Sequence, residues 1–212
     1  MDNVNIAIVI LAAGRSTRMG AFKPLLPIGG RPAVVHCVDA AQEAGVRDII
    51  VVTGYMREEL ERVLKEYAPG ARRIHNVHYA DGMFSSVRAG VSAVSALPGG
   101  VDGFFLLPAD CAAASKDTLA TLKNEFAKTG GAAVIRPKFE GRRGHPPLIP
   151  AAFIGPILKY NGENGLKGFL SGLPTIEKEM QTPETLLDMD TPEDYAAMLK
   201  YFGIPPAYHT AP

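Results

Sequence analysis

Near its start the chain reads Ile6-Ala7-Ile8-Val9-Ile10-Leu11-Ala12-Ala13-Gly14-Arg15-Ser16-Thr17-Arg18-Met19-Gly20-Ala21-Phe22-Lys23. Residues 6–11 are continuously apolar and mostly β-branched, which predicts a strand covered on both faces of a sheet. The small residues Ala12, Ala13 and Gly14 follow, and they let the backbone approach a ligand closely, with free N–H groups facing a chain of phosphates. We therefore expect an anion-binding loop directly after the first strand.

Cations in this loop support the same expectation. Arg15, Arg18 and Lys23 would add positive charge where a triphosphate lies, and Lys23 would neutralise its α-phosphate in the transition state. A Walker A loop needs Ser or Thr after its lysine, whereas Pro24 follows here, and the dinucleotide fingerprint needs three glycines where this loop has two. The alternative is a surface turn that is basic without a function.

The rest of the first half alternates between strands and helices. Apolar strands are expected at residues 48–53 and 102–107, and amphipathic helices at residues 32–44, 57–67 and 85–96. Short links between such elements imply an α/β fold, with a doubly wound, mainly parallel sheet and helices on both faces. Ligands of these sheets bind beyond the carboxyl ends of the strands, where the strand order reverses. The second half is less regular, with an irregular ribbon expected over residues 136–149 and helices over residues 151–160 and 192–202.

Length and composition describe one domain. The 212 residues suggest a domain over residues 1–203, followed by an irregular tail or linker over residues 204–212. The 22 basic residues balance 22 acidic ones, so no overall field favours nucleic acid or an acidic membrane as a partner. Cys37 and Cys111 show no metal-ligand spacing, and the first apolar run is too short for a signal peptide or a membrane span. We expect a soluble protein of the cytoplasm.

Carboxylates follow extended segments at two places. Asp110 comes shortly after the third predicted strand, where a carboxylate is well placed for Mg²⁺, although a turn or a helix cap also accounts for it. Asp188 and Asp190 would share one side of an extended segment. Asp190 also precedes Thr191-Pro192, so it can cap the last helix instead.

Polar residues also gather in two turns. Arg142, Arg143 and His145 lie in a loop rich in glycine and proline, and guanidinium groups suit phosphate well. The alternative is a solvated face in which His145 is a turn residue. Earlier in the chain, Asp81-Gly82 reads as a turn, and Ser85 or Ser86 as the N-cap of the third helix.

Several motifs resemble one family. Residues 11–27 read Leu-Ala-Ala-Gly-x-Ser-x-Arg-Met-Gly-x-x-Lys-x-Leu-Leu-Pro and resemble the opening motif of the MobA-like nucleotidyltransferases, the family that modifies molybdopterin. Residues 75–87 resemble the same family, and residues 186–195 are similar to its closing motif. Ala13 and the Gly-His-Pro element at 144–146 resemble the cytidylyltransferase branch, since guanylyltransferases usually carry Gly-Gly in the opening motif. Where the family usually reads Gly-Asp-Met-Pro, this chain has Ala-Asp-Cys-Ala at 109–112.

The resemblance implies a nucleotide-diphospho-sugar transferase-like fold and a set of site residues. The catalytic residues would be Arg18, Lys23 and Asp110. The ligands of Mg²⁺ would be Asp110 and Asp190, with Asp188 as the alternative to Asp190. The nucleotide would lie against Ala12, Ala13, Gly14, Ala80, Asp81 and Ser86. The acceptor phosphate would lie against Arg142, Arg143 and His145.

The implied reaction joins CTP, or another nucleoside triphosphate, to molybdenum-loaded molybdopterin and gives molybdopterin cytosine dinucleotide and pyrophosphate. The acceptor phosphate would attack the α-phosphorus in line, so positioning and charge supply the catalysis without a covalent enzyme intermediate. A molybdoenzyme or its chaperone is an expected protein partner, and neither nucleic acid nor a membrane is expected. Two alternatives stay open. One is the same transfer onto a sugar phosphate or alcohol phosphate, and the other is a nucleotide- or cofactor-binding module without turnover.

Overall fold

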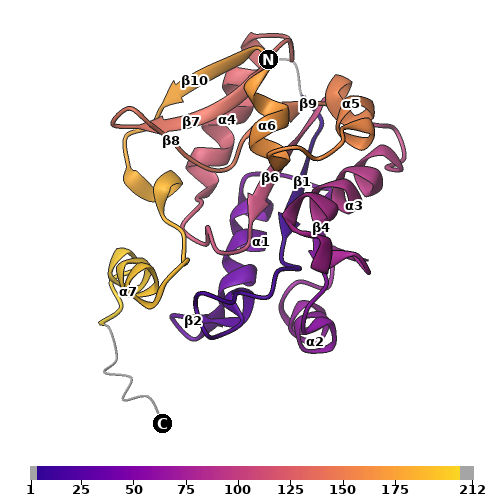
Figure 1. Cartoon of the computed structure of the whole chain (residues 1–212). Helices are drawn as coiled ribbons and strands as arrows, with labels where there is room; N and C mark the ends of the chain where they lie inside the picture. Colours follow the sequence, from indigo (N-terminus) through magenta and orange to yellow (C-terminus); the bar gives the residue numbers. More distant parts are fainter. Residues whose placement is uncertain (1–3, 206–212) are drawn as a thin grey trace.

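A mixed eight-stranded sheet forms the centre of the computed structural model, which describes residues 4–205 (Figure 1). The strands are β1 Ile6–Leu11, β2 Pro27–Ile28, β3 Arg31–Pro32, β4 Ile49–Thr53, β5 Arg72–His75, β6 Gly103–Pro108, β7 Val134–Phe139, β8 Arg142–Arg143, β9 Leu148–Pro150 and β10 Thr175–Glu179. The α-helices are α1 Ala33–Glu43, α2 Arg57–Tyr67, α3 Met83–Ser95, α4 Lys116–Lys128, α5 Ile154–Lys159, α6 Gly165–Ser171 and α7 Pro192–Tyr201. Short 3₁₀ helices are η1 Lys23–Leu25, η2 Tyr79–Asp81, η3 Ala151–Phe153 and η4 Pro183–Leu186.

The large sheet has the strand order β10-β7-β9-β6-β1-β4-β5, and β8 pairs with β7. Strands β5, β4, β1 and β6 are parallel to one another, whereas β9 is antiparallel to both β6 and β7. Strand β7 therefore runs in the direction of β6, and their carboxyl ends meet at one edge. The expected α/β fold with a mainly parallel sheet is confirmed.

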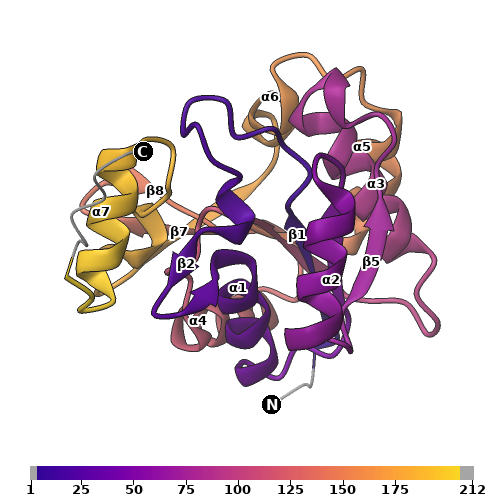
Figure 2. The ribbon, with the colours of Figure 1, turned by 90° about the horizontal axis from the view of Figure 1, so that it is seen from below.

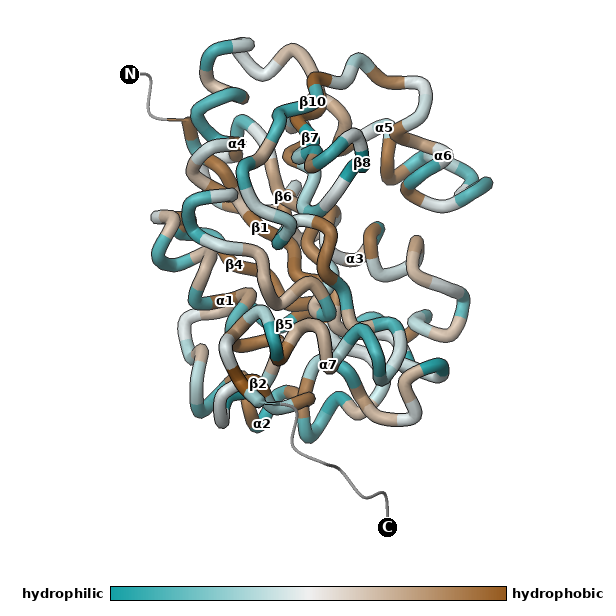
Figure 3. The backbone as a smooth tube through the Cα atoms, turned by 90° about the vertical axis from the view of Figure 1, so that its left-hand side faces the viewer, coloured by the Kyte–Doolittle hydropathy of each residue, from teal (hydrophilic) through white to brown (hydrophobic). Residues whose placement is uncertain are grey.

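Each face of the sheet carries its own hydrophobic cluster. Because side chains alternate along a strand, Ile8 and Ile10 of β1 belong to the cluster with α1, α2 and α4, whereas Ala7 and Val9 belong to the cluster with α3, α5 and α6. Figure 2 shows α1 and α4 on one side of the sheet and α3, α5 and α6 on the other. The most hydrophobic backbone segments run through the middle of the molecule, along β1, β4 and β6 (Figure 3).

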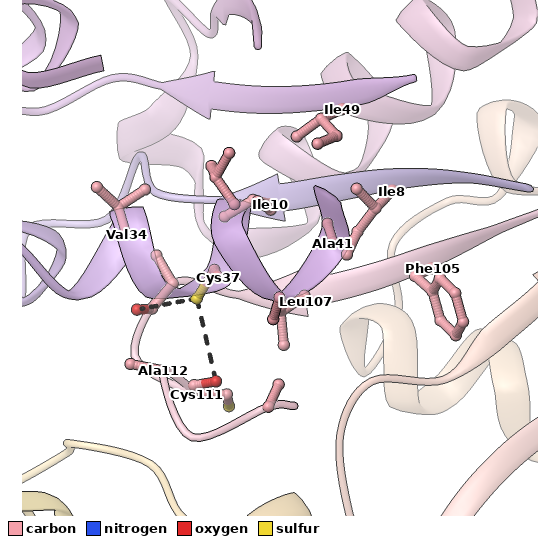
Figure 4. Close-up of a cluster of buried hydrophobic side chains, with 14 of the residues drawn as sticks. Ile8, Ile10, Val34, Cys37, Ala41, Ile49, Phe105, Leu107, Cys111 and Ala112 are labelled. Atoms are coloured by element: carbon pink, nitrogen blue, oxygen red, sulfur yellow. Dashed lines mark hydrogen bonds between the residues drawn. The ribbon is translucent and has the colours of Figure 1, made fainter. Parts of the chain in front are cut away.

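The turn after β6 is packed into the first of these clusters. Cys37 and Cys111 are buried free thiols, and the Cys37 sulfur lies 3.8 Å from the Ala109 carbonyl oxygen and 4.0 Å from that of Cys111 (Figure 4). Burial raises the pKa of both thiols, so neither is a reactive thiolate. Ala109 and Cys111, the residues that flank Asp110, therefore hold its turn against α1.

Most elements of the first half lie where the sequence places them. Helix α1 begins after Pro32 and ends before Gly45, whose φ of 71° needs a residue without a side chain. Helix α3 begins at Met83, two residues earlier than expected. The expected N-cap role of Ser85 or Ser86 is wrong, because Gly82 is the N-cap and no side chain caps this helix.

The second half departs further from the expectation. Residues 136–149 are not a ribbon over the sheet, because β7, β8 and β9 are strands within it. Pro137 does not break β7, since its carbonyl oxygen still accepts a hydrogen bond from the Gly144 amide. Helix α4 escaped the sequence reasoning, although Ser115 caps it by accepting a hydrogen bond from the Thr118 amide. Of the expected tail, residues 206–212 lie outside the described residues. None of the helices between residues 4 and 205 is long and apolar enough to cross a membrane.

The strand order reverses between β1 and β6. From β1 the chain moves outward through β4 to β5, and then returns to place β6 on the other side of β1. Loops that leave the carboxyl ends of β1 and β6 diverge at such a point and leave a crevice for a ligand. Figure 2 shows the loop after β1, in indigo, projecting from this edge of the sheet.

Candidate active site

A cleft of about 310 Å³ lies at this reversal point. Its floor is the loop over residues 11–18, and one wall is the start of α3, where Met83 and Ser86 line it. Lys23, Asp110 and Asp190 close the opposite side. The cleft therefore collects the predicted loop and the predicted carboxylates from three distant parts of the chain.

The first turn of the loop is fixed by strand β4. The Ala12 amide donates to the Val52 carbonyl oxygen over 3.0 Å, and the Tyr55 amide donates to the Ala13 carbonyl oxygen over 3.1 Å. A Cβ atom at Gly54 would lie 2.8 Å from that of Ala13, so the two segments touch where only glycine fits. Ala13 is 2% exposed and packs into the core. Its methyl group therefore fixes the loop, while Ala13 also lines the cleft.

Ser16 shapes the second half of the loop and was missed by the sequence reasoning. It has a φ of 55°, and its carbonyl oxygen accepts from the Met19 amide, so the chain turns back sharply here. Its hydroxyl oxygen accepts a hydrogen bond of 3.1 Å from the Lys23 amide. Ser16 thus holds the backbone at which Lys23 enters the site. The only signal for Ser16 in the sequence is its place in the opening motif, before Arg18 and Lys23.

Lys23 joins the two predicted metal carboxylates. Its Nζ atom lies 2.9 Å from Asp110 Oδ2 and 2.5 Å from Asp190 Oδ1. Arg18 Nη2 lies 2.8 Å from Asp190 Oδ2, and its side chain is 71% exposed. The four side chains that the sequence predicts for catalysis and metal binding therefore form one cluster at the mouth of the cleft.

The charges in this cluster stabilise one another. Burial opposes the charged form of Lys23, but hydrogen bonds to Asp190 and Asp110 outweigh it and raise the pKa of the amine. The hydrogen bond from Lys23 lowers the pKa of Asp190, and Arg18 adds to the effect. The contact between Lys23 and Asp190 therefore favours the charged form of both groups.

Asp190 is not a helix cap. Thr191 caps α7 by accepting from the Asp194 amide, and the Asp194 side chain accepts in return from the Thr191 amide, which is a capping box. Asp190 is therefore left to bind Lys23 and Arg18. Asp188, the alternative to Asp190, makes no ion pair with a described residue, and burial followed by the charges of Asp110 and Asp190 raises the pKa of its carboxyl. Residues 187–189 lie outside any strand, which removes the strand alternation on which that alternative rested.

The donor set has the composition that a hard divalent cation takes. Carboxylate oxygens of Asp110 and Asp190 converge within 2.9 Å of a single nitrogen. Among residues 4–205 no group of three or more His, Cys, Asp or Glu side chains could hold a metal alone. Magnesium is commonly held by one or two carboxylates and completed by water and substrate phosphates, so these two residues fit such an ion.

The wall at the start of α3 is organised by Asn76. This side chain is 4% exposed, and its amide donates to Ser86 Oγ over 3.0 Å and to Ser85 Oγ over 2.8 Å. Ser86 is buried and lines the cleft. Ala80 and Asp81 are exposed, and the cleft is bounded by their neighbours Tyr79 and Gly82. Arg15 lies over the Tyr79 ring, 5.7 Å from its centre.

The predicted acceptor residues do not line the cleft itself. Arg142 is exposed on the two-residue strand β8. The Nε atom of Arg143 lies 2.5 Å from Glu177 Oε1, so its charge is already paired. His145 is half-buried, and its amide donates to the Thr185 carbonyl oxygen over 2.8 Å. His145 is near enough to Asp110 to respond to its charge.

A profile described as the MobA-like NTP transferase domain matches residues 8–179. The chain belongs to the MobA-like NTP transferase family. The match spans β1 to β10 and leaves out only η4 and α7 among the elements after β1. The family assignment inferred from the opening motif is therefore confirmed, and with it the nucleotidyltransferase class of enzyme. The module without turnover is not supported.

Relatives of this MobA-like chain cover nearly all of it. The molybdenum cofactor cytidylyltransferase of Escherichia coli K12 is 32% identical over 193 residues, which are 88% of this chain and 92% of the relative. The structure of a nucleotidyl transferase from Methanothermobacter has a TM-score of 0.78 with 26% identity, covering 94% of this chain and 98% of that one. Rv0371c of Mycobacterium tuberculosis, in a complex with manganese, has a TM-score of 0.73 with 22% identity over 92% and 98% of the two chains, and shares the fold.

Proposed function

We propose that this chain is a cytidylyltransferase that transfers CMP from CTP to the phosphate of a molybdopterin-type acceptor and releases pyrophosphate. The observation that carries the proposal is the contact of one amine, Lys23 Nζ, with both Asp110 and Asp190 beside a small-residue loop. This arrangement puts cationic and metal-binding groups side by side, as transfer of a nucleotide between phosphates requires. The choice of CTP and of molybdopterin is supported by the relative from Escherichia coli.

The loop after β1 would bind the triphosphate. Its small residues leave the backbone open, since a Cβ atom at Gly14 would meet nothing within 4 Å. Arg15 and Arg18 bring charge to the same loop, and Arg18 is largely exposed, so it is free to turn toward a phosphate. Binding would begin with these N–H groups and cations, because they are accessible before any rearrangement of the buried Lys23.

Lys23 would act on the reacting phosphorus. Its amine is 10% exposed and held at a fixed point by two carboxylates and by Ser16. A cation that is placed before the reaction stabilises the charge that develops on the α-phosphate without reorganising in the transition state. The acceptor phosphate is itself the nucleophile, so no side chain has to remove a proton.

Asp110 and Asp190 would hold a divalent cation, and we propose Mg²⁺. Nucleotidyltransferases of this kind use divalent metals. When bound, the ion would neutralise phosphate charge and favour departure of pyrophosphate. Because Lys23 lies between the same two carboxylates, it would keep their geometry in the free enzyme.

Competition between nucleotides tests the proposal directly. The purified protein, supplied with Mg²⁺ and molybdenum-loaded molybdopterin, should release pyrophosphate from CTP. CTP and GTP mixed in one reaction give the ratio of their specificity constants, and we expect CTP to be preferred. A preference for GTP would overturn the cytidylyltransferase assignment and leave the nucleotidyltransferase class intact.

The acceptor is tested by substitution. A sugar phosphate and an alcohol phosphate are offered in place of molybdopterin, with CTP constant and pyrophosphate release as the signal. If turnover is faster with either compound, that compound and not molybdopterin would be the preferred acceptor. Such an outcome is possible because loops on the shared fold set the choice of acceptor.

A further inference from the structure

Arg136 on strand β7 is a cation without a partner. Among the described residues it forms no ion pair, and its Nε atom is buried without a hydrogen bond. Buried polar atoms are nearly always paired, so each exception needs an explanation. The residue was not identified from the sequence, where it began the supposed ribbon.

The nearest carboxylate is taken by other cations. Glu177 lies directly beside Arg136 in the pairing of β10 with β7. Its two oxygens instead bind Lys138 Nζ, at 2.9 Å, and Arg143 Nε, at 2.5 Å. Arg136 is therefore left without an ion pair, whereas Lys138 and Arg143 are both paired with Glu177.

The position of Arg136 in the sheet directs it to the side of the cleft. Val134, two residues earlier, packs in the cluster with α3, whereas Ile135 packs on the opposite face. Side chains two apart share a face, so Arg136 lies on the face of α3, whose first turn forms the cleft wall. It is the third of the six residues of β7, a strand whose carboxyl end lies at the same edge of the sheet as Asp110.

His145 is near both Arg136 and Asp110. The charges of both Arg136 and Asp110 act on its imidazole, and its Nδ1 atom is buried without a hydrogen bond. Backbone contacts fix the loop that carries it: the Gly144 amide donates to the Pro137 carbonyl oxygen over 2.9 Å, and a Cβ atom at Gly144 would lie 2.3 Å from the Thr185 carbonyl oxygen. Thr185 Oγ1 is a third buried polar atom without a partner.

We propose that Arg136, with His145, binds the phosphate of the acceptor and orients it beside Asp110. This inference rests on the proposed nucleotidyl transfer and assigns its acceptor subsite. A planar guanidinium matches two phosphate oxygens at once, and an unpartnered one attracts an anion more strongly than one already paired with a carboxylate. Arg143, paired with Glu177, and Arg142, exposed on β8, contribute less.

Kinetics of matched variants test whether Arg136 contributes more than Arg143 to binding of the acceptor. Arg136→Gln should raise the apparent KM for molybdopterin by about ten- to hundredfold and leave the dissociation constant for CTP within about twofold. Arg136→Lys should recover part of the lost acceptor affinity, because lysine keeps the positive charge but cannot bind two phosphate oxygens at once. Arg143→Gln should have a smaller effect than Arg136→Gln. Arg62→Gln, on the exposed side of α2, is the control for loss of an arginine. An equal loss of CTP affinity in Arg136→Gln, or a larger effect of Arg143→Gln, would refute the proposal.

A second measurement separates this subsite from the identity of the acceptor. Inorganic phosphate is titrated into the protein while the imidazole signals of His145 are followed by NMR, with His145→Gln used for assignment. The signals should shift in the wild type and in Arg136→Lys, and stay unchanged in Arg136→Gln. If molybdopterin is not a substrate and the shift occurs, the acceptor proposal fails and the subsite stands. If the wild type shows no shift at saturating phosphate, the subsite is wrong whatever the acceptor.

Discussion

Two groups of buried or half-buried carboxylates in this molecule are held in different ways. Asp110 and Asp190 at the cleft are held by cations, Lys23 and Arg18. Glu184, in η4, is 7% exposed and accepts hydrogen bonds from three neutral hydroxyl groups. They belong to Ser115, at 2.5 Å, Thr118, and Tyr201, at 2.7 Å.

The difference separates function from stability. Hydroxyl groups leave the Glu184 charge in place while they join the start of α4 to η4 and to the end of α7. Burial opposes this charge, but the hydrogen bonds prevail and lower the pKa of Glu184. Burial and the contact with Glu184 raise the pKa of Tyr201 to about 12. At the cleft, by contrast, opposite charges lie side by side. A substrate that carries both a phosphate and a metal ion would replace these ion pairs, its phosphate binding the cations and its metal the carboxylates.

Neutralising the cleft carboxylate should give the largest effect. Asp110→Asn should reduce turnover at least ~100-fold, the order lost when one well-placed charge stabiliser is removed. Its melting temperature should change little, because Asp110 lies outside the apolar core. Pyrophosphate release measures the first and thermal unfolding the second. Glu66→Gln, on the exposed side of α2, controls for loss of a carboxylate. Retained turnover in Asp110→Asn would remove this residue from the site.

Removing the shared cation should act nearly as strongly. Lys23→Ala should lower turnover by roughly ten- to hundredfold and weaken CTP binding, because the amine acts on the phosphate that reacts. Calorimetric titration of CTP in the absence of acceptor measures the binding. Lys65→Ala, exposed on α2, is the matched control. If Lys23→Ala binds and turns over CTP normally, the ion pairs of Lys23 with Asp110 and Asp190 are only structural.

The Glu184 cluster should show the opposite pattern. Glu184→Gln should lower the free energy of unfolding by about 1–3 kcal/mol, since hydrogen bonds to a buried charged acceptor are weakened, while turnover of the folded protein stays near that of the wild type. The lowered pKa of Glu184 adds a pH test. Its contribution is present above about pH 4.5 and is lost as the pH falls through the native pKa, so the two proteins should converge in acid. Urea unfolding at several pH values measures both. A difference that persists unchanged in acid would contradict the ionic explanation.

His145 should give the smallest effect. Burial, followed by the charge of Arg136, lowers the pKa of His145, and the charge of Asp110 opposes this only in part. Below about pH 6.5 the unfolded chain takes up a proton that the native state does not, so the wild type loses stability, by at most about 1.4 kcal/mol per pH unit, until the native pKa is passed. His145→Gln should lack this loss between neutral and mildly acidic pH. Urea unfolding of both proteins at pH 7 and pH 5.5 measures this difference. If the pKa of His145 is not lowered, the free energies of unfolding of the two proteins would change by the same amount.

The sequence predicts the part of the site that is local. The apolar run before the loop fixes where β1 ends, and the strand-end rule places Asp110 near it. That Asp190 joins them followed from the family motif, because nothing local distinguishes it from a helix cap. Ser16 accepts a hydrogen bond from a backbone amide and Asn76 donates to two serines, and neither contact is revealed by periodicity or composition. Arg136 was missed because proline and glycine around β7 suggested an irregular segment, whereas pairing with β9 and β10 keeps it a strand.

The bridge at Lys23 also has a consequence for the order in which the protein is made. Its two carboxylate partners lie 87 and 167 positions further along the chain. At translation rates of ~5–20 residues per second, Asp190 leaves the ribosome on the order of ten seconds or more after Lys23. Strands β4, β5 and β6 are made in that interval, after β1 and its loop, so the loop exists while its bridge to Asp110 and Asp190 is incomplete. The ion pairs of Lys23 are therefore complete only when the segment that carries Asp190 has docked.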